Sequence, residues 1–106
     1  MHEIMDNEIL IHELRNFLDS RGCLTKYPAK FRLKILSLYY LSEKLERGVR
    51  YTERELNEVI MRWHTFEDWA LLRRDMFDRG FLERERNGAT YRLADTQPAL
   101  SKFGLQ

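Results

Sequence analysis

Apolar and polar residues follow one another along the chain in four helical patterns and then in two strand-like patterns. The first pattern predicts a helix over about residues 3–20. Its apolar stripe consists of Ile4, Leu10, Ile11, Leu14, Phe17 and Leu18. Such a stripe can pack against the core of its own chain or against a second copy of the protein. A homodimer through this N-terminal helix is therefore kept open as an alternative to packing within the chain.

The second pattern predicts the most hydrophobic helix of the chain, over about residues 29–46, with Pro28 at a first-turn position. Its inward row is expected to be Phe31, Ile35, Leu38, Leu41 and Leu45, widened by Leu36, Tyr39 and Tyr40. We expect this helix to form the centre of the core. Arg47 and Gly48 close it, and residues 49–51 are expected to add a short strand.

A third helix is indicated by Thr52 and Glu55, which have the spacing of a capping box. In this motif the threonine hydroxyl accepts a hydrogen bond from the amide of the third helical residue, and the glutamate accepts one from the amide of the cap. The apolar residues that follow recur at helical spacing: Leu56, Val59, Ile60 and Trp63. We expect this helix to pack by that single face.

The fourth helical pattern follows a break at residues 64–68, where Thr65 or Asp68 is expected to cap the next helix. The apolar positions predict its buried face: Ala70, Leu71 or Leu72, Met76 and Phe77. The charged positions are expected to point largely outward: Arg73, Arg74, Asp75, Asp78 and Arg79. Gly80 is expected to end the helix in the left-handed conformation, which places Phe81 against Met76.

Two strand-like segments close the pattern. Residues 81–85 and 90–93 alternate apolar and polar positions, and Asn87 with Gly88 between them favours a type I′ turn. The order of helix, short strand, two helices and hairpin predicts a winged helix-turn-helix in an α+β, mostly α, fold. We therefore expect an extra N-terminal amphipathic helix over residues 1–20, a winged-helix domain over residues 21–94, and a tail over residues 95–106 that docks or frays.

Several short motifs in this order resemble a bacterial family known as domain of unknown function 2087. They are PAK at residues 28–30, YTE at 51–53, ELN at 55–57, His64 followed by D-x-A-x-L-R-R at 68–74, D-x-G-x-L-x-R at 78–84, Gly88 and Tyr91. The resemblance covers about residues 21–92 and implies a relation to winged helix-turn-helix regulators, with no established activity or catalytic residue. Phe31 and Leu33 depart from it because the family is more basic there, and the N-terminal helix lies outside it.

The length and composition of the chain limit the class of protein, its location and the role of its cysteine. A chain of 106 residues with 43% hydrophobic and 33% charged residues suits one soluble globular domain. No apolar run reaches the roughly 20 residues of a membrane span, so we expect no membrane association and a cytoplasmic location. The single Cys23 excludes an internal disulfide, and we expect a partly buried structural thiol rather than a redox site.

Charge is distributed unevenly although the net charge is only +1. Residues 21–50 contain eight basic and two acidic residues, concentrated around Arg21, Lys26, Lys30, Arg32 and Lys34. If double-stranded DNA is the partner, the helix over residues 68–79 would lie in the major groove and Arg73 or Arg74 would reach a base edge. The other basic residues assigned to DNA are expected to contact its backbone or minor groove: Arg79, Arg84, Arg86, Arg92, Lys26, Lys30 and Lys34.

The charge of that helix also supports a different interpretation. Residues 67–79 contain three arginines and four carboxylates. These can form solvated i,i+4 pairs, such as Arg74 with Asp78 and Asp75 with Arg79. The same scaffold would then serve as a protein-interaction or dimerisation module that does not bind DNA, using Trp63, Trp69, Phe66 and the N-terminal helix.

His64 and Asp68 are four residues apart and can form two ligands of a metal or an acid and base pair. Neither His2 nor His12 is spaced to complete such a site. We therefore expect both residues to fix the turn between two helices through capping hydrogen bonds, with Arg73 as a possible member of that network. No phosphate loop, nucleophile motif or zinc-ligand spacing is present, so we expect no enzyme, no metal and no cofactor.

Overall fold

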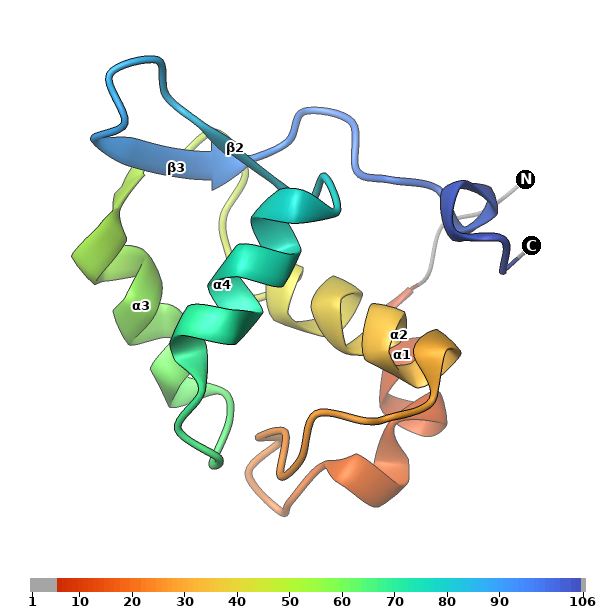
Figure 1. The fold of residues 1–106 in the computed structure, drawn as a ribbon. Helices are drawn as coiled ribbons and strands as arrows, with labels where there is room; N and C mark the ends of the chain where they lie inside the picture. The colour runs from red at the N-terminus through yellow and green to blue at the C-terminus, as the bar shows by residue number, and fades with distance from the viewer. Residues whose placement is uncertain (1–5, 106) are drawn as a thin grey trace.

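The protein is mostly helical with one small sheet, as described for residues 6–105 by a computed structural model (Figure 1). The helices are α1 (Asn7–Glu13), α2 (Phe31–Ser42), α3 (Glu53–Arg62) and α4 (Trp69–Asp78), with short 3-10 helices η1 (Arg15–Phe17) and η2 (Leu100–Phe103). The strands are β1 (Tyr51–Thr52), β2 (Leu82–Arg84) and β3 (Thr90–Leu93). The fold class is therefore α+β. Within this part of the chain, no helix has the length and apolar character that a membrane crossing requires.

The N-terminal helix is shorter than the prediction of residues 3–20. Its N-cap is Asp6, whose side chain accepts a hydrogen bond from the Ile9 amide at 3.0 Å, and the helix ends at Glu13. Farther on, Asp19 accepts hydrogen bonds from the amides of Arg21 and Cys23, both at 2.9 Å. These bonds turn the chain at residues 19–23, so a helix cannot continue to residue 20 as predicted. Residues 3–5, and with them Ile4, lie outside the described residues.

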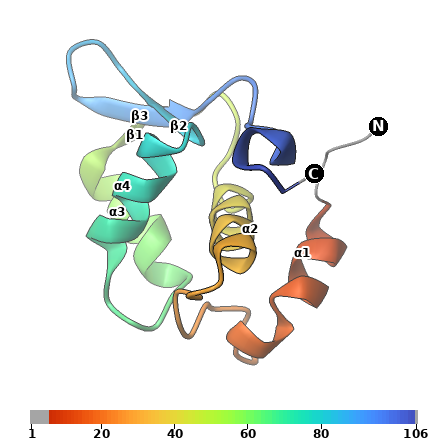
Figure 2. The same cartoon turned by 45° about the vertical axis from the view of Figure 1, so that its right-hand side comes forward.

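The apolar stripe of α1 packs within the chain. Leu10 and Leu14 are fully buried, and α1 lies against α2 (Figure 2). Ile9 and Ile11 lie on the outer face and are 45% and 43% exposed. The homodimer through this helix stays a prediction, and Ile9 and Ile11 are the residues that it would use.

Helix α2 forms the centre of the core, as predicted, but it is shorter at both ends than residues 29–46. The helix begins after Lys30, so Pro28 precedes it, and Leu45 is buried beyond its end. Its buried apolar residues are Ile35, Leu36, Leu38, Tyr39, Tyr40 and Leu41. The expected inward position of Phe31 is wrong, because this ring is 44% exposed and lies under the guanidinium of Arg79.

The sheet has the strand order β1-β3-β2 and is antiparallel throughout. The predicted short strand is confirmed: Tyr51 of β1 pairs with Tyr91 of β3, which also pairs with Arg84 of β2. The predicted type I′ turn is wrong, because Gly88 has a φ of 74° while Asn87 has a negative φ. The Asn87 side chain instead accepts a hydrogen bond from the Ala89 amide at 2.9 Å.

The predicted start of α3 and the predicted end of α4 are confirmed. Thr52 and Glu55 form the capping box, with hydrogen bonds of 3.1 Å and 2.9 Å. Gly80 ends α4 with a φ of 90°, and the Phe81 amide donates to the Met76 carbonyl at 2.9 Å. Gly80 therefore sets the direction in which the chain leaves α4 and enters β2.

The C-terminal segment docks on the core and does not fray over its described part. Leu100 is buried, and the ring of Phe103 stacks on that of Phe81 with 6.0 Å between centroids. The Tyr39 hydroxyl donates a short hydrogen bond to the Pro98 carbonyl, and the Gln97 amide donates to the Phe81 carbonyl at 3.1 Å. The segment lies beside α2, on the side away from α3 (Figure 2).

Candidate nucleic-acid interface

The turn between α3 and α4 is held by His64, which is 6% exposed. The Asp68 amide donates to its Nε2 at 3.0 Å, so Nδ1 carries the hydrogen and donates to the Ile60 carbonyl at 2.6 Å. This is the neutral imidazole acting as a structural link. The carboxylate of Asp68 makes no capping hydrogen bond, so only its backbone takes part. Residues 6–105 contain no group of three or more His, Cys, Asp or Glu placed to hold a metal.

Leu24 ties the same turn to the N-terminal part of the chain. Its amide donates to the Trp63 carbonyl and its carbonyl accepts from the Thr65 amide, both at 2.9 Å. Cys23 beside it is buried, and its thiol donates to the Arg62 carbonyl at 3.2 Å. The orientation of α4 relative to α3 is thus fixed by backbone bonds on one side and by His64 on the other.

The two adjacent arginines of α4 lie in different surroundings. Arg73 donates to the Asn57 side chain at 2.5 Å and lies 3.9 Å from a carboxylate oxygen of Glu53, with 21% of its side chain exposed. Arg74 is exposed, and no carboxylate of the described residues lies within 4.0 Å of it. Arg73 therefore binds α3 and not the His64 network, whereas Arg74 is available to a partner.

Arg92 of β3 is surrounded by carboxylates. Its guanidinium lies 2.6 Å from Glu83, 3.3 Å from Glu85 and 2.9 Å from Asp95. The hydrogen bond to Asp95 and the three negative charges raise the pKa of Arg92. The residue holds β2 and β3 together, and its charge is neutralised within the protein. The sequence suggested contact with DNA phosphates, for which Arg92 is poorly placed.

A hollow of about 310 Å³ lies between α4 and the hairpin of β2 and β3. It is lined by Ala70, Arg73, Arg74, Phe77, Arg84 and Tyr91. The Arg84 guanidinium lies 5.5 Å from the centre of the Tyr91 ring, and Phe77 meets that ring edge-on. Arg86 is exposed in the adjoining turn. No ion pair is formed by Arg74, Arg84 or Arg86 within residues 6–105.

The carboxylates of α4 do not pair with its own arginines. Neither Arg74 with Asp78 nor Asp75 with Arg79 forms an ion pair within the described chain. Asp75 instead accepts a hydrogen bond of 2.7 Å from the Tyr27 hydroxyl. Leu72 and Met76 are the buried residues of α4, and Trp69 packs partly buried against the core. The expected inward positions of Ala70 and Phe77 are wrong, because Ala70 is exposed and Phe77 is 41% exposed, as is Leu71 at 38%.

The segment of residues 26–31, called the basic connector below because it contains Lys26 and Lys30, borders α4 on the side away from the hairpin. Tyr27 binds Asp75 and Phe31 lies under Arg79, so residues 27–31 pack along α4. Lys34 lies over the Tyr27 ring at 5.0 Å, and Lys26 and Lys30 are exposed. Most of the basic residues that were predicted to bind DNA thus lie along the two sides of α4. Sequence reasoning missed Asn57 and Tyr27, whose partners lie 16 and 48 residues away, because no local signal identifies them.

The partly buried hydroxyl of Tyr27 predicts a loss of stability in alkali. Burial, followed by the hydrogen bond to Asp75, raises the pKa of Tyr27. Above about pH 10 the unfolded chain loses this proton while the folded chain keeps it, so the free energy of unfolding falls as pH rises. We expect urea denaturation of Tyr27→Phe to show a shallower decline between about pH 9 and pH 11 than the wild-type protein shows. An equal decline in both proteins would contradict this role.

Residues 23–93, about two thirds of the chain, match the family described as "Uncharacterized protein conserved in bacteria", domain of unknown function 2087. The chain belongs to this family. Comparisons with curated proteins and with solved structures gave no match.

The family region of this member runs from Cys23 to Leu93 and so contains α2, α3, α4 and all three strands. The arginine-lined hollow and the basic connector lie within it. Helix α1 and the docked C-terminal segment lie outside it. The candidate interface is therefore formed entirely by the part of the chain that defines the family.

Proposed function

We propose that the protein is a winged helix-turn-helix protein that binds double-stranded DNA and takes part in transcription regulation in the bacterial cytoplasm. The order α2-β1-α3-α4-β2-β3 with the strand order β1-β3-β2 supports this fold assignment. In such a fold the second helix of the helix-turn-helix lies in the major groove and the hairpin contacts the flanking backbone. Here these elements are α4 and the hairpin of β2 and β3 (Figure 1).

The observation that carries the proposal is the group of unpaired arginines beside α4. Arg74, Arg84 and Arg86 have no carboxylate partner, although the described chain pairs Arg73 and Arg92 with carboxylates a few ångströms away. An exposed cation without a protein partner can release counterions from a phosphate backbone. The three arginines are therefore assigned the direct contacts, and Arg73 and Arg92 the positioning of the elements that carry them.

The lysines of the connector extend this surface. Lys26 and Lys30 are exposed on the other flank of α4, where they suit backbone contacts to the adjacent turn of the duplex. Arg79 and Lys34 lie over the rings of Phe31 and Tyr27, so their charges stay at the surface while their stems are held. The proposal assigns Lys26, Lys30, Lys34 and Arg79 to contacts with the DNA backbone, and it assigns a catalytic role to no residue.

Fluorescence anisotropy of a labelled mixed-sequence duplex tests the proposal. With about five cations on phosphates, the logarithm of the association constant is expected to fall with a slope of about −4.5 against the logarithm of salt concentration. Binding should then weaken by more than about 100-fold between about 50 mM and 200 mM salt. No binding at the lower salt concentration, where non-specific affinity is greatest, would overturn the DNA-binding function.

A protein-interaction module is the second candidate, favoured by the exposed apolar residues. Leu71 and Phe77 lie on the outer face of α4, and Ile9 and Ile11 lie on that of α1. Light scattering on Ile9→Asp/Ile11→Asp tests the homodimer through α1. If this dimer forms, the variant is expected to halve the particle mass. An unchanged mass would exclude α1 as the interface, and Leu14 is left unaltered because it is fully buried.

A further inference from the structure

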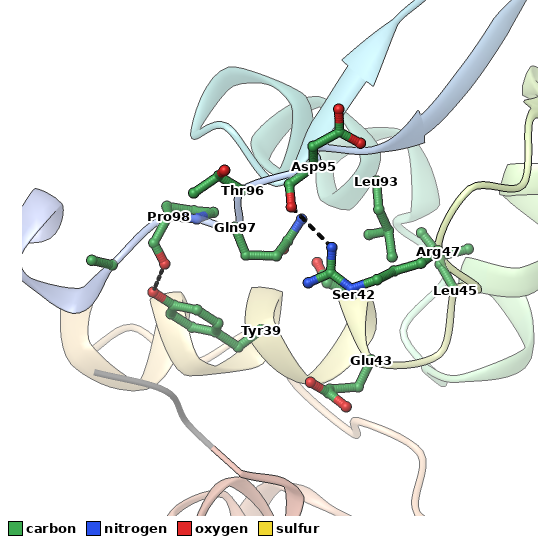
Figure 3. Close-up of a pocket in the computed structure, with 11 residues that line it drawn as sticks. Tyr39, Ser42, Glu43, Leu45, Arg47, Leu93, Asp95, Thr96, Gln97 and Pro98 are labelled. Carbon is green, nitrogen blue, oxygen red and sulfur yellow. Dashed lines mark hydrogen bonds between the residues drawn. The ribbon is translucent and has the colours of Figure 1, made fainter. Parts of the chain in front are cut away.

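A second hollow, of about 620 Å³, lies between the end of α2 and the segment that follows β3 (Figure 3). Its volume is in the range of pockets for small molecules. We propose that this pocket binds a small organic carboxylate with an apolar body. The inference concerns a face of the protein other than the candidate DNA interface and does not depend on DNA binding.

Ser42 is the first indication of a ligand. It lines the pocket, is 6% exposed, and its hydroxyl has no hydrogen-bond partner within residues 6–105. Ser37 on the same helix is also buried, but its hydroxyl donates to the Leu33 carbonyl at 2.9 Å, as helical serines usually do. A buried hydroxyl without a partner lowers the stability of the folded state. A polar atom of a bound molecule would supply the missing hydrogen bond.

Arg47 supplies a cation in the same pocket. Its Nη1 donates to the Asp95 carbonyl at 2.9 Å, and no carboxylate of the described chain lies within 4.0 Å of its guanidinium. The Asp95 carboxylate binds Arg92 instead, and the Glu43 side chain points away from the guanidinium (Figure 3). The remaining N–H groups of Arg47 form a planar fork that suits a carboxylate.

Apolar side chains form two walls of the pocket, and its lining also includes Glu43, Asp95, Thr96, Gln97 and Ala99. Leu45 and Leu93 are each 6% exposed, and Pro98 and the ring of Tyr39 form the opposite wall. One cation, one hydroxyl and these apolar walls fit a monocarboxylate with a branched or aromatic body. A phosphate would need more cations than the single arginine of this lining offers.

Asp95 connects the pocket to the hairpin. Its backbone carbonyl holds Arg47, and its carboxylate holds Arg92, which also binds Glu83 and Glu85. A carboxylate on Arg47 therefore changes the surroundings of a residue that is two positions beyond the end of β3. We expect the amides of β2 and β3 to report occupancy of the pocket together with those that line it.

The proposal is tested by titrating the ¹⁵N-labelled full chain with phenylacetate, indole-3-acetate and 4-methylpentanoate, each compared with its primary amide. At least one carboxylate is expected to give saturable shifts at Ser42, Arg47 and residues 95–99, with at least about ten-fold weaker binding of the amide. Arg47→Met should weaken binding at least about ten-fold, while the control Arg50→Met, at an arginine that is 70% exposed, should leave it unchanged. No saturable shift up to about 10 mM, or equal affinity in Arg47→Met, overturns the proposal.

The two buried serines give an independent readout. Ser42→Ala is expected to keep or raise the thermal midpoint of the free protein and to weaken carboxylate binding, because it removes a hydroxyl that only the ligand satisfies. Ser37→Ala, the matched control, is expected to lower the midpoint and leave carboxylate binding unchanged. A lower midpoint for Ser42→Ala with unchanged carboxylate affinity would show that its hydroxyl serves the fold and not a ligand.

Discussion

Replacing Arg74 and Arg84 together by glutamate is expected to weaken binding to duplex DNA by at least about 100-fold while the protein stays folded. Each arginine is exposed and forms no ion pair within residues 6–105, so its loss leaves no buried group unsatisfied. The two substitutions remove two contacts with phosphates and add two negative charges that repel the DNA. The number of counterions released on binding, read from the salt dependence of the association constant, should decrease by about two. Arg73 is left in place because Asn57 and Glu53 hold it.

The matched control is Arg15→Glu/Arg62→Glu, which changes the net charge by the same amount. Neither arginine forms an ion pair in the described chain, and η1 and the end of α3 lie away from the hairpin (Figure 1). The control is expected to retain most of the affinity in the same anisotropy assay. Equal losses of DNA affinity in both double variants would indicate that the net charge of the protein, and not these two positions, determines binding. If Arg74→Glu/Arg84→Glu binds DNA with unchanged affinity, the DNA contact would be assigned to Lys26 and Lys30 of the connector instead.

The largest loss of stability is expected for Phe81→Ala, at about 3–5 kcal/mol. Phe81 is fully buried, meets the Tyr39 ring edge-on at 4.8 Å, and stacks on Phe103 at 6.0 Å. Its removal leaves a cavity between α2, α4 and the C-terminal segment, which relaxes only in part. Because small domains have a total stability of about 5–15 kcal/mol, the variant is expected to unfold at a much lower urea concentration.

Phe77→Ala is the control for this effect, since it removes the same ring four residues earlier. Phe77 is 41% exposed and its described ring contact is with Tyr91 at 6.4 Å, so we expect a loss of about 1 kcal/mol or less. Equilibrium urea denaturation of the two variants and the wild type gives the comparison. Similar decreases in the free energy of unfolding for both variants would mean that Phe81 contributes no more to stability than an aromatic ring at the surface does.

Features that depend on neighbouring residues could be predicted from the sequence. The capping box of Thr52 and Glu55 and the left-handed Gly80 were recognisable because each interacting group lies within a few positions. The extent of α1 was overestimated because apolar spacing continues past Glu13. Asp19 and Gly22 are residue types that favour a turn, and the chain does turn there before residue 23. Asp19 accepts a hydrogen bond from the Arg21 amide, and Gly22 has a φ of 84°.

The candidate interface was less predictable because its geometry depends on contacts between residues that are distant in sequence. Arg73 and Arg74 are adjacent, and helical geometry turns their side chains apart by about 100°. The pattern could not say which one faces Asn57. Likewise, the alternation of β3 places Arg92 on a strand but does not reveal that three carboxylates meet there. The pocket at Ser42 and Arg47 depends on where the C-terminal segment docks, for which no motif was visible.

The packing of α1 and of the segment around Leu100 against the core of the family region has a consequence for the size of the folding unit. Leu10 and Leu14 precede the family region, Leu100 follows it, and all three are buried in the same core as Ile35 and Leu38. A fragment cut at the family boundaries would expose the apolar surface of α2 that these leucines cover. In this protein the region that matches the family is therefore shorter than the region that shares one core, and it packs against sequence that the family does not define.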